Sequence, residues 1–166
     1  MSLRIGILTV SDRSSRGERP DASGPVLARA VNNLGWIVGV TDIVPDDYEI
    51  LVSLLTKWAD SGDYDVILST GGTGFSPRDI TPEATLAVIQ RAANGISEAM
   101  RFESLKITPH AMLSRGVAGI RGQTLLVNLP GSPKAALENF EVIQPVLPHA
   151  VQLLCSDVKA ESSHQF

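Results

Sequence analysis

The stretch "STGGTGFSPRDITPEA", residues 69–84, joins two segments of different periodicity. Before it, "YDVILS" (64–69) is an apolar run of the kind expected for a parallel strand buried on both faces. After it, "TPEATLAVIQRAA" (81–93) is typical of a helix, with Thr81 as the predicted N-cap and Pro82 at the first helical position. A strand that leads directly into a helix predicts one unit of an alternating α/β fold.

The same alternation extends in both directions along the chain. Further strands are predicted at 3–10, at 36–44 and as a short pair within 116–130 that turns at Arg121-Gly122-Gln123. Three more helices are expected: one opened by Pro25 and stopped by Gly35, one over 50–59 that ends near Gly62, and one opened by Pro133 behind Ser132. The pattern predicts a layered α/β fold with a mostly parallel sheet and an antiparallel component from the 116–130 pair.

Length and composition indicate an ordinary globular domain. The 166 residues are 43% hydrophobic and 19% charged, and we expect one domain over 1–155 followed by a disordered polar tail over 156–166. The net charge of −4 argues against nucleic acid as the main partner, and no apolar run is long enough to cross a membrane. Cys155 is the only cysteine, which excludes an internal disulfide and favours a reducing, cytoplasmic location.

Four polar loops follow four of the predicted strands. They are "SDRSSRGERPDASG" (11–24), "PDD" (45–47), "TGGTGFSPRD" (70–79) and "PGSP" (130–133). In an open parallel sheet, ligands bind beyond the carboxyl ends of the strands. We therefore expect these loops to share one edge of the sheet and to form a binding site there.

The glycines of the third loop suit an anion. Gly71, Gly72 and Gly74 lack a Cβ atom, so a ligand can approach their N–H groups closely and φ can be positive. Consecutive N–H groups near a helix start cradle phosphate. The motif is neither a dinucleotide fingerprint nor a P-loop, and a tight strand-to-helix turn is the plain alternative. The nine residues between Ser69 and Asp79 are more than a turn needs.

Acidic side chains in these loops have competing interpretations. Asp79 is not needed as a cap if Thr81 caps the next helix, so a metal or phosphate role competes with a solvated residue that pairs with Arg78. Asp46 has Glu49 three residues later, which suits a helix N-cap with its reciprocal partner as well as a functional role.

The remaining polar residues give weaker signals. Asp12 forms a turn with Ser14 or touches a ligand, and Cys155 is expected in the core. His110, His149 and His164 are too dispersed to form a helical metal pair. The segment "ESLKITPHAMLSRGVAG" (103–119) is either a loop with a solvated face or a substrate wall that supplies positive charge.

Three stretches together resemble the molybdopterin adenylyltransferase family, which includes bacterial MogA and MoaB and the matching domain of gephyrin. They are "ILTVSDRSSRGERPDASGP" (7–25), "STGGTGFSPRDITPEAT" (69–85) and "SLKITPHAMLSRGVAGIRGQTLLVNLPGSPKA" (104–135). The resemblance covers roughly 4–154, and the "SDR" and "PRD" motifs and the length favour the MogA-like branch.

The resemblance implies a specific activity. Such proteins use Mg-ATP to transfer AMP to the terminal phosphate of molybdopterin and release pyrophosphate, and a molybdotransferase then uses the product. It also implies a three-layer α/β/α sandwich and a homotrimer. Two alternatives stay open: a MoaB-like scaffold that binds pterin or nucleotide without catalysis, and a CinA-like nucleotide hydrolase.

The resemblance also implies roles for individual residues. Asp46 and Asp79 match the catalytic acids and are the expected Mg²⁺ ligands. The expected nucleotide and phosphate contacts are Thr70, Gly71, Gly72, Thr73 and Gly74 in one loop and Pro130, Gly131 and Ser132 in another. The expected substrate contacts are Ser11, Asp12, Arg13 and Ser114. Ser132 stands where the family often has Asn or Gln, which puts the side-chain contact of that loop in question.

Overall fold

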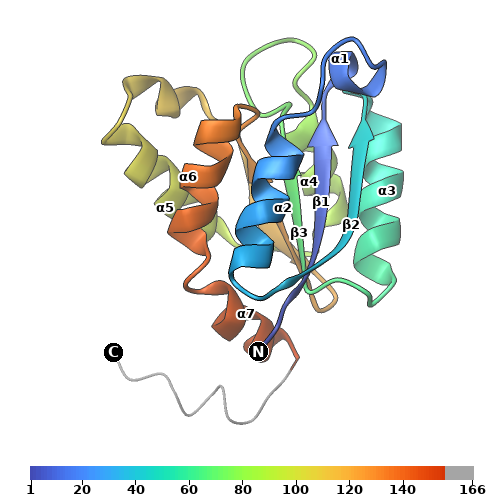
Figure 1. The fold of residues 1–166 in the computed structure, drawn as a ribbon, viewed down its shortest axis with the longest axis vertical. Helices are drawn as coiled ribbons and strands as arrows, with labels where there is room; N and C mark the ends of the chain where they lie inside the picture. Colours follow the sequence, from blue (N-terminus) through green and yellow to red (C-terminus); the bar gives the residue numbers. More distant parts are fainter. Residues whose placement is uncertain (156–166) are drawn as a thin grey trace.

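Six strands form one mixed sheet in the computed structural model, which describes residues 1–155 (Figure 1). Their order across the sheet is β2 (Ile37–Val44), β1 (Arg4–Val10), β3 (Val66–Thr70), β6 (Thr124–Leu129), β5 (Ala118–Arg121) and β4 (Arg91–Ala92). The first four strands are mutually parallel, and β5 and β4 pair antiparallel. This confirms the predicted mostly parallel sheet with its antiparallel component. The expected disorder of 156–166 lies outside the described residues.

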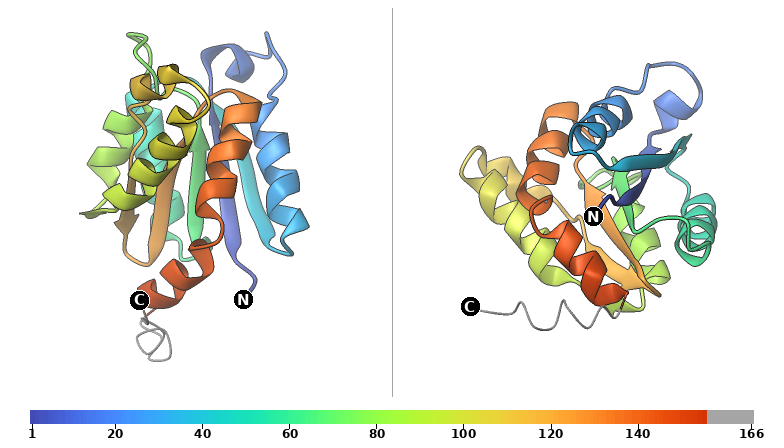
Figure 2. Two further views of the ribbon diagram at one scale, coloured as in Figure 1. Left: turned by 90° about the vertical axis from the view of Figure 1, so that its left-hand side faces the viewer. Right: turned by 60° about the horizontal axis from the view of Figure 1, so that its bottom comes forward.

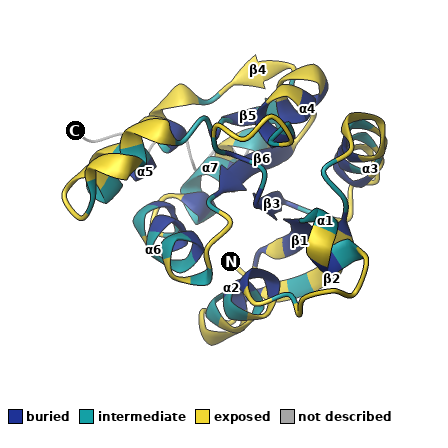
Figure 3. Cartoon of the chain, turned by 90° about the horizontal axis from the view of Figure 1, so that it is seen from above, coloured by how far each residue is buried: buried dark blue, intermediate teal, exposed yellow. Residues whose placement is uncertain are grey.

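Helices cover both faces of this sheet, which confirms the three-layer sandwich (Figures 2 and 3). One layer holds α2 (Ser23–Asn33), α5 (Asn94–Leu105), α6 (Pro133–Ile143) and α7 (Leu147–Leu154), and the other holds α3 (Tyr48–Asp60) and α4 (Thr81–Val88). Two short elements lie in connections, namely α1 (Asp12–Ser15) and the 3-10 helix η1 (Pro109–Leu113). The sequence pattern does not predict α5, whereas α7 corresponds to the apolar helical stretch that ends at Cys155.

Side-chain alternation along β1 explains why two hydrophobic cores form. Ile5 and Ile7 point into the core shared with α2 and α6, where Phe140 is fully buried. Leu8 and Val10 point into the core shared with α3 and α4. Because successive residues of a strand face opposite sides, a central strand needs apolar residues at every position, as its continuous apolar run indicated.

The helix predicted over 81–93 is shorter than expected. It ends at Val88, because Ile89 is extended, with φ −70° and ψ 148°. Arg91 then pairs with Ile120 as the edge strand β4. The helical pattern of apolar residues in the sequence thus extends beyond the end of the helix, into residues that pair with β5.

Two predicted helix caps are wrong. Thr81 is the first residue of α4 and not its cap, and its Oγ1 donates to the carbonyl oxygen of Gly71 at 2.9 Å. Asp47, not Asp46, caps α3 by accepting a hydrogen bond from the backbone N–H of Ile50 at 3.0 Å. Neither Thr81 nor Asp46 therefore caps a helix, and both side chains instead make hydrogen bonds within the loops at the sheet edge.

The structure agrees with the sequence prediction at Ser132 and contradicts it at Cys155. Ser132 caps α6 as expected by accepting a hydrogen bond from the Ala135 N–H at 3.2 Å, with Pro133 at the first helical position. Cys155 is exposed, so its predicted place in the core is wrong, because it follows the last residue of α7 at the protein surface.

Candidate functional site

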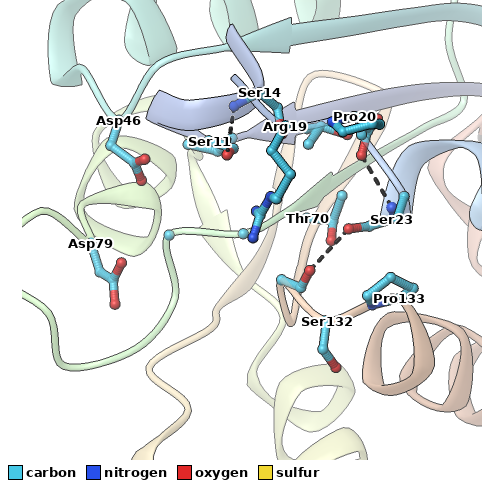
Figure 4. A pocket seen from close by; sticks show the side chains of 17 residues that line it. Ser11, Ser14, Arg19, Pro20, Ser23, Asp46, Thr70, Asp79, Ser132 and Pro133 are labelled. Atoms are coloured by element: carbon cyan, nitrogen blue, oxygen red, sulfur yellow. Dashed lines mark hydrogen bonds between the residues drawn. The ribbon is translucent and has the colours of Figure 1, made fainter. Parts of the chain in front are cut away.

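The carboxyl ends of the parallel strands open into one pocket of about 700 Å³ (Figure 4). All four strand-end loops contribute to it, which confirms that they share one edge of the sheet. Its lining comprises Thr9, Val10, Ser11, Ser14, Arg19, Pro20, Asp21, Ala22, Ser23, Asp46, Thr70, Gly71, Gly72, Asp79, Gly131, Ser132 and Pro133. We call it the larger pocket.

The glycine loop begins where β3 ends, and its first two glycines are required by its shape. Gly71 and Gly72 have φ of +102° and +63°, in the left-handed region that favours glycine. A Cβ atom on Gly71 would collide with the carbonyl oxygen of Val10, and one on Gly72 would meet Thr81 Oγ1. The tight-turn interpretation of these glycines is therefore correct, and it is compatible with a ligand role because both residues line the larger pocket.

Backbone donors differ along this loop. The N–H of Gly71 donates to the carbonyl oxygen of Leu129 at 3.2 Å and so serves the fold. Within the described residues, no acceptor is hydrogen-bonded to the N–H groups of Gly72, Thr73 or Gly74. These three consecutive N–H groups are therefore the ones in the predicted anion cradle that can donate hydrogen bonds to a ligand.

The glycine loop and the loop after β6 hold each other in place. Thr70 Oγ1 donates to the carbonyl oxygen of Pro130 at 2.6 Å. A Cβ atom on Gly131 would lie 3.2 Å from the Cα atom of Gly71, so the two backbones are nearly in contact. Ser23 at the start of α2 donates to the carbonyl oxygen of Gly131 at 2.9 Å. The two predicted nucleotide loops thus form one rigid floor.

Asp46 and Asp79 both line the larger pocket and both are half-buried. Burial raises the pKa of Asp46, and the negative charges of Asp12 and Asp79 raise it further. Asp79 Oδ2 accepts a hydrogen bond from the backbone N–H of Ser76 at 3.1 Å, which fixes the carboxylate within its loop. Two carboxylates in one pocket, each with oxygen atoms to offer, are therefore brought together as predicted.

Asp12 does not form the predicted turn with Ser14, and its alternative role as a ligand contact stays a prediction. Its carboxylate accepts hydrogen bonds from Arg78 Nε and Nη2, both at 3.0 Å, so Arg78 pairs with Asp12 and not with Asp79. The turn with Ser14 is instead made by Ser11, whose Oγ accepts a hydrogen bond from the Ser14 N–H at 3.2 Å. Burial raises the pKa of Asp12, but the hydrogen bonds from Arg78 and from the Asp46 N–H, with the charge of Arg78, outweigh it and hold that pKa below its usual value.

The four residues predicted to contact substrate do not lie in one pocket. Ser11 lines the larger pocket, whereas Asp12 and Arg13 lie outside its lining. Ser114 lines a second, smaller pocket of about 290 Å³ on the other side of the glycine loop, together with Thr73, Gly74 and Pro130. The smaller pocket and the larger pocket share the same two loops but no lining residue.

Segment 103–119 forms one wall of the smaller pocket, but neither Lys106 nor Arg115 lines it, so the positive charge expected from this segment is not supplied by either residue. A contact of this wall with substrate stays a prediction. Ile107, His110 and Ser114 line the pocket, and Arg101 of α5 supplies a positive charge. Lys106 does not line it and pairs with Glu103 at 2.6 Å. The wall therefore combines apolar and polar groups, which suits an organic ligand with polar edges.

Two residues of the larger pocket were missed by sequence reasoning. Asp21 lines the larger pocket and accepts hydrogen bonds from Thr9 Oγ1 at 2.8 Å and from the Ser23 N–H at 3.1 Å. Its position just before α2 was a recognisable capping signal. Arg19 also lines the pocket. Arg115, a basic residue of segment 103–119, lines neither pocket and instead donates to the carbonyl oxygens of Gly74 at 2.6 Å and Asp79 at 2.7 Å. The sequence did not indicate these contacts, because the partners are distant along the chain.

The donor set suits a hard divalent cation shared with a ligand. Among the described residues, no cluster of three or more histidine, cysteine or acidic side chains is placed to hold a metal by itself. Mg²⁺ commonly takes only one or two protein carboxylates and completes its shell with phosphate and water oxygens. Asp46 and Asp79 fit that requirement, since both are half-buried carboxylates that line the same pocket.

Known proteins share both the sequence and the fold. Residues 6–149 match the family described as "Probable molybdopterin binding domain". A gephyrin from Dictyostelium discoideum is 47% identical over 94% of this chain, which spans only 23% of that protein. A molybdopterin adenylyltransferase from Helicobacter pylori is 41% identical over 92% of this chain and 88% of its own length.

A solved structure has the same architecture. It is that of the molybdopterin biosynthesis enzyme MoaB from Thermus thermophilus, which superposes with a TM-score of 0.87 and 47% identity over 93% of this chain and 98% of its own. Within the described residues, no helix is long and apolar enough to cross a bilayer. With its match over 6–149 and its near full-length relatives, the chain belongs to the molybdopterin-binding domain family that includes the molybdopterin adenylyltransferases.

Proposed function

We propose that this protein is a molybdopterin adenylyltransferase, which transfers AMP from ATP to the terminal phosphate of molybdopterin and releases pyrophosphate. One observation carries the proposal. Two pockets lie on either side of the glycine loop, and the larger pocket contains the carboxylates of Asp46 and Asp79. A reaction between two phosphate-bearing substrates needs this arrangement of adjoining sites around a shared phosphate loop.

The larger pocket suits the nucleotide. Its floor of Thr70 to Gly72 and Gly131 to Ser132 offers closely approachable backbone, and Ser11 lies at its edge. The smaller pocket suits the pterin, with Ser114 and Arg101 as polar contacts. The N–H groups of Thr73 and Gly74 lie between the two sites and would donate to the phosphates that react.

Asp46 and Asp79 would hold Mg²⁺ together with the nucleotide phosphates. When bound, the ion neutralises charge on the transferring phosphoryl and on the leaving pyrophosphate. Asp12 does not need to touch the substrates in this scheme, because it acts on the position of Asp46 through backbone hydrogen bonds. Arg13 is left without a role in the larger pocket, so the role implied for it by resemblance has no support in the geometry.

The transfer step needs no general base. An oxygen of the terminal phosphate of molybdopterin is already ionised and attacks the α-phosphorus of ATP. The bond from the α-phosphorus to the oxygen that links it to the β-phosphorus breaks, and pyrophosphate leaves with the bonding electrons. Among the residues that the structure describes, no histidine lines the larger pocket. The N–H groups of the glycine loop are fixed in advance and stabilise the shifting negative charge without rearranging.

Ser132 also has a defined position in this scheme. Its Oγ accepts the capping hydrogen bond from the Ala135 N–H, so its hydroxyl hydrogen stays available as a donor toward the larger pocket. A serine therefore retains part of the donor function that Asn or Gln would provide at this position.

The assembly and the cellular setting belong to the same proposal. We propose a cytoplasmic homotrimer that passes its product to a molybdotransferase. Light scattering should give a mass about three times the 17.7 kDa of one chain. A mass of one chain at micromolar concentration would contradict the trimer.

The proposed reaction is tested by mixing protein, molybdopterin and Mg-ATP and identifying adenylyl-molybdopterin by mass spectrometry. Stoichiometric pyrophosphate release should accompany the product. A MoaB-like scaffold would bind its ligands without releasing pyrophosphate. A CinA-like hydrolase would turn over nucleotide in the absence of molybdopterin, and either result would overturn the proposal.

A further inference from the structure

Arg19 is the basic side chain of the larger pocket. Of the described residues that line this pocket, three are acidic, Asp21, Asp46 and Asp79, and Arg19 alone is cationic. Figure 4 shows its side chain extending into the pocket between the two acids Asp46 and Asp79 on one side and Ser132 on the other. An acidic pocket that accepts a polyanion needs positive charge, and a guanidinium is the side chain best suited to phosphate.

The partners of neighbouring charges leave Arg19 available for a ligand. On the same loop, Arg16 pairs with Glu18 through two contacts, Nε to Oε1 at 2.6 Å and Nη2 to Oε2 at 3.1 Å. Asp21 is saturated by Thr9 and by the backbone of α2. No hydrogen bond or ion pair engages the Arg19 guanidinium within the described residues.

The backbone around Arg19 is held by its neighbours. Gly17 has φ of +72° and turns the chain, and Pro20 restricts the backbone directly after Arg19. Asp21 then anchors the loop to β1 through Thr9 Oγ1 and to the first turn of α2 through the N–H groups of Ser23 and Gly24. The Cα position of Arg19 at the pocket rim is therefore fixed before any ligand arrives, which lowers the entropy lost on binding.

We propose that Arg19 binds the phosphates of the nucleotide in the larger pocket, as a direct contact additional to the glycine loop. The proposal rests on the proposed function for the identity of the ligand. The residue supplies a full positive charge and a bidentate set of donors, which the neutral backbone of the glycine loop cannot supply. Arg19 thereby favours nucleotides that carry phosphate over the bare nucleoside.

The test compares the binding of adenosine, AMP, ADP and ATP, with Mg²⁺ present, by calorimetric titration of the full chain. Arg19→Gln should weaken ATP binding roughly tenfold to a hundredfold, the usual effect of one lost hydrogen bond to a charged group. Adenosine binding should change less than twofold. Arg19→Lys should retain part of the ATP affinity, because it keeps the charge and loses the planar fork.

Arg16→Gln is the matched control, since it removes the same charge from the same loop but from a side chain already paired with Glu18. It should leave ATP affinity within about twofold of wild type, because an exposed ion pair contributes little. The melting temperature of each variant reports whether it is folded.

Four results would overturn the assignment of Arg19: equal ATP affinity in Arg19→Gln and wild type, an equal loss for adenosine and ATP, an equal loss in Arg16→Gln, or weakened binding of molybdopterin alone. These results differ from failure of the proposed function, which appears in the wild type as ATP binding without adenylyl-molybdopterin. If the wild type does not bind ATP at all, both proposals fail.

Discussion

Asp12 and Asp46 each donate a backbone N–H to the carboxylate of the other. The Asp12 nitrogen lies 3.0 Å from Asp46 Oδ2, and the Asp46 nitrogen lies 3.1 Å from Asp12 Oδ1. Arg78, from the loop after β3, donates to both carboxylate oxygens of Asp12. Loops from three parallel strands are thus joined through Asp12, and the position of Asp46 in the larger pocket depends on contacts made outside it.

Asp46→Asn should stabilise the metal-free protein at neutral pH. Burial and neighbouring negative charge raise the pKa of Asp46 in the folded state, so the folded protein binds this proton more tightly than the unfolded chain does. Ionised Asp46 therefore destabilises the fold above its folded pKa, and the penalty disappears as the pH falls through that value. We expect the melting temperature to rise by roughly 1–3 °C at pH 7.5.

The measurement is a melting curve of wild type and Asp46→Asn from pH 4 to pH 8 without magnesium. The difference between the two proteins should shrink toward the acidic end. Asp42→Asn removes an equal charge from an exposed position of β2 and serves as the control. A destabilised Asp46→Asn at pH 7.5 would show that its hydrogen bond to Asp12 outweighs the cost of its charge.

Asp79→Asn should abolish most activity while the protein stays folded. Asparagine keeps an oxygen that can accept the hydrogen bond from the Ser76 N–H, so the loop retains its internal contact. The lost charge should lower the rate of adenylylation by about 10²–10³-fold, the usual effect of removing one electrostatic stabiliser. Pyrophosphate release is measured beside the melting temperature, and near-normal release would make Asp79 an ordinary solvated residue.

The fold was predictable because its strongest signals are local. The buried strands β1 and β3 are continuous apolar runs, and the prolines at α4 and α6 lie in the first turn, where proline is favoured. Errors arose where a tertiary contact outweighs a local preference. Thr81 looks like a cap in sequence, yet its hydroxyl is bonded to Gly71 across the loop.

The site was predictable in its location but not in its internal contacts. Strand ends and glycines indicated the edge of the sheet. The partner of Arg78, Asp12, is 66 residues away in the sequence, and the side-chain partners of Arg115 are 32 to 41 residues away. The structure also changes how the glycine loop is best probed. A valine at Gly72 would strain a backbone with φ of +63° and collide with Thr81. A loss of nucleotide binding in that variant could therefore not be distinguished from a loss of folding.

Gly74→Ala is a cleaner probe of the loop. Gly74 does not have a left-handed φ, and a Cβ atom there would lie 2.8 Å from Asp79 Oδ2, with no other contact as close. The carboxylate of Asp79 must therefore shift, while the backbone is not strained. We expect turnover to fall about tenfold, because catalysis is sensitive to small displacements, with a stability change within about 0.5 kcal/mol.

The control is Gly95→Ala in the first turn of α5, where a Cβ atom meets nothing within 4 Å. It should leave activity unchanged and stability equal or slightly higher. Steady-state rates and melting curves of both variants are compared with wild type. Full activity in Gly74→Ala would mean that the position of Asp79 is not critical.

Arg115 is expected to act as a positioning residue for Asp79. Its guanidinium donates to the carbonyl oxygens of Gly74 and Asp79 and pairs with Glu83, while its backbone N–H donates to the Thr73 carbonyl oxygen at 2.9 Å. Arg115→Gln should lower kcat about tenfold to a hundredfold through displacement of Asp79, with a smaller change in KM for ATP. Arg115→Lys should keep the charge opposite Glu83 but not the two carbonyl contacts, so its kcat should stay low.

Arg121→Gln separates positioning from general loss of stability. Arg121 makes a comparable set of contacts, with two hydrogen bonds of 2.7 Å to Asp60 and one of 3.1 Å to the Val88 carbonyl oxygen, but it lies outside the lining of both pockets. Both glutamine variants should lower the melting temperature by a similar, small amount, whereas only Arg115→Gln should lose kcat. Equal losses of kcat in the two variants, or recovery of kcat in Arg115→Lys, would show that Arg115 stabilises the fold without positioning Asp79.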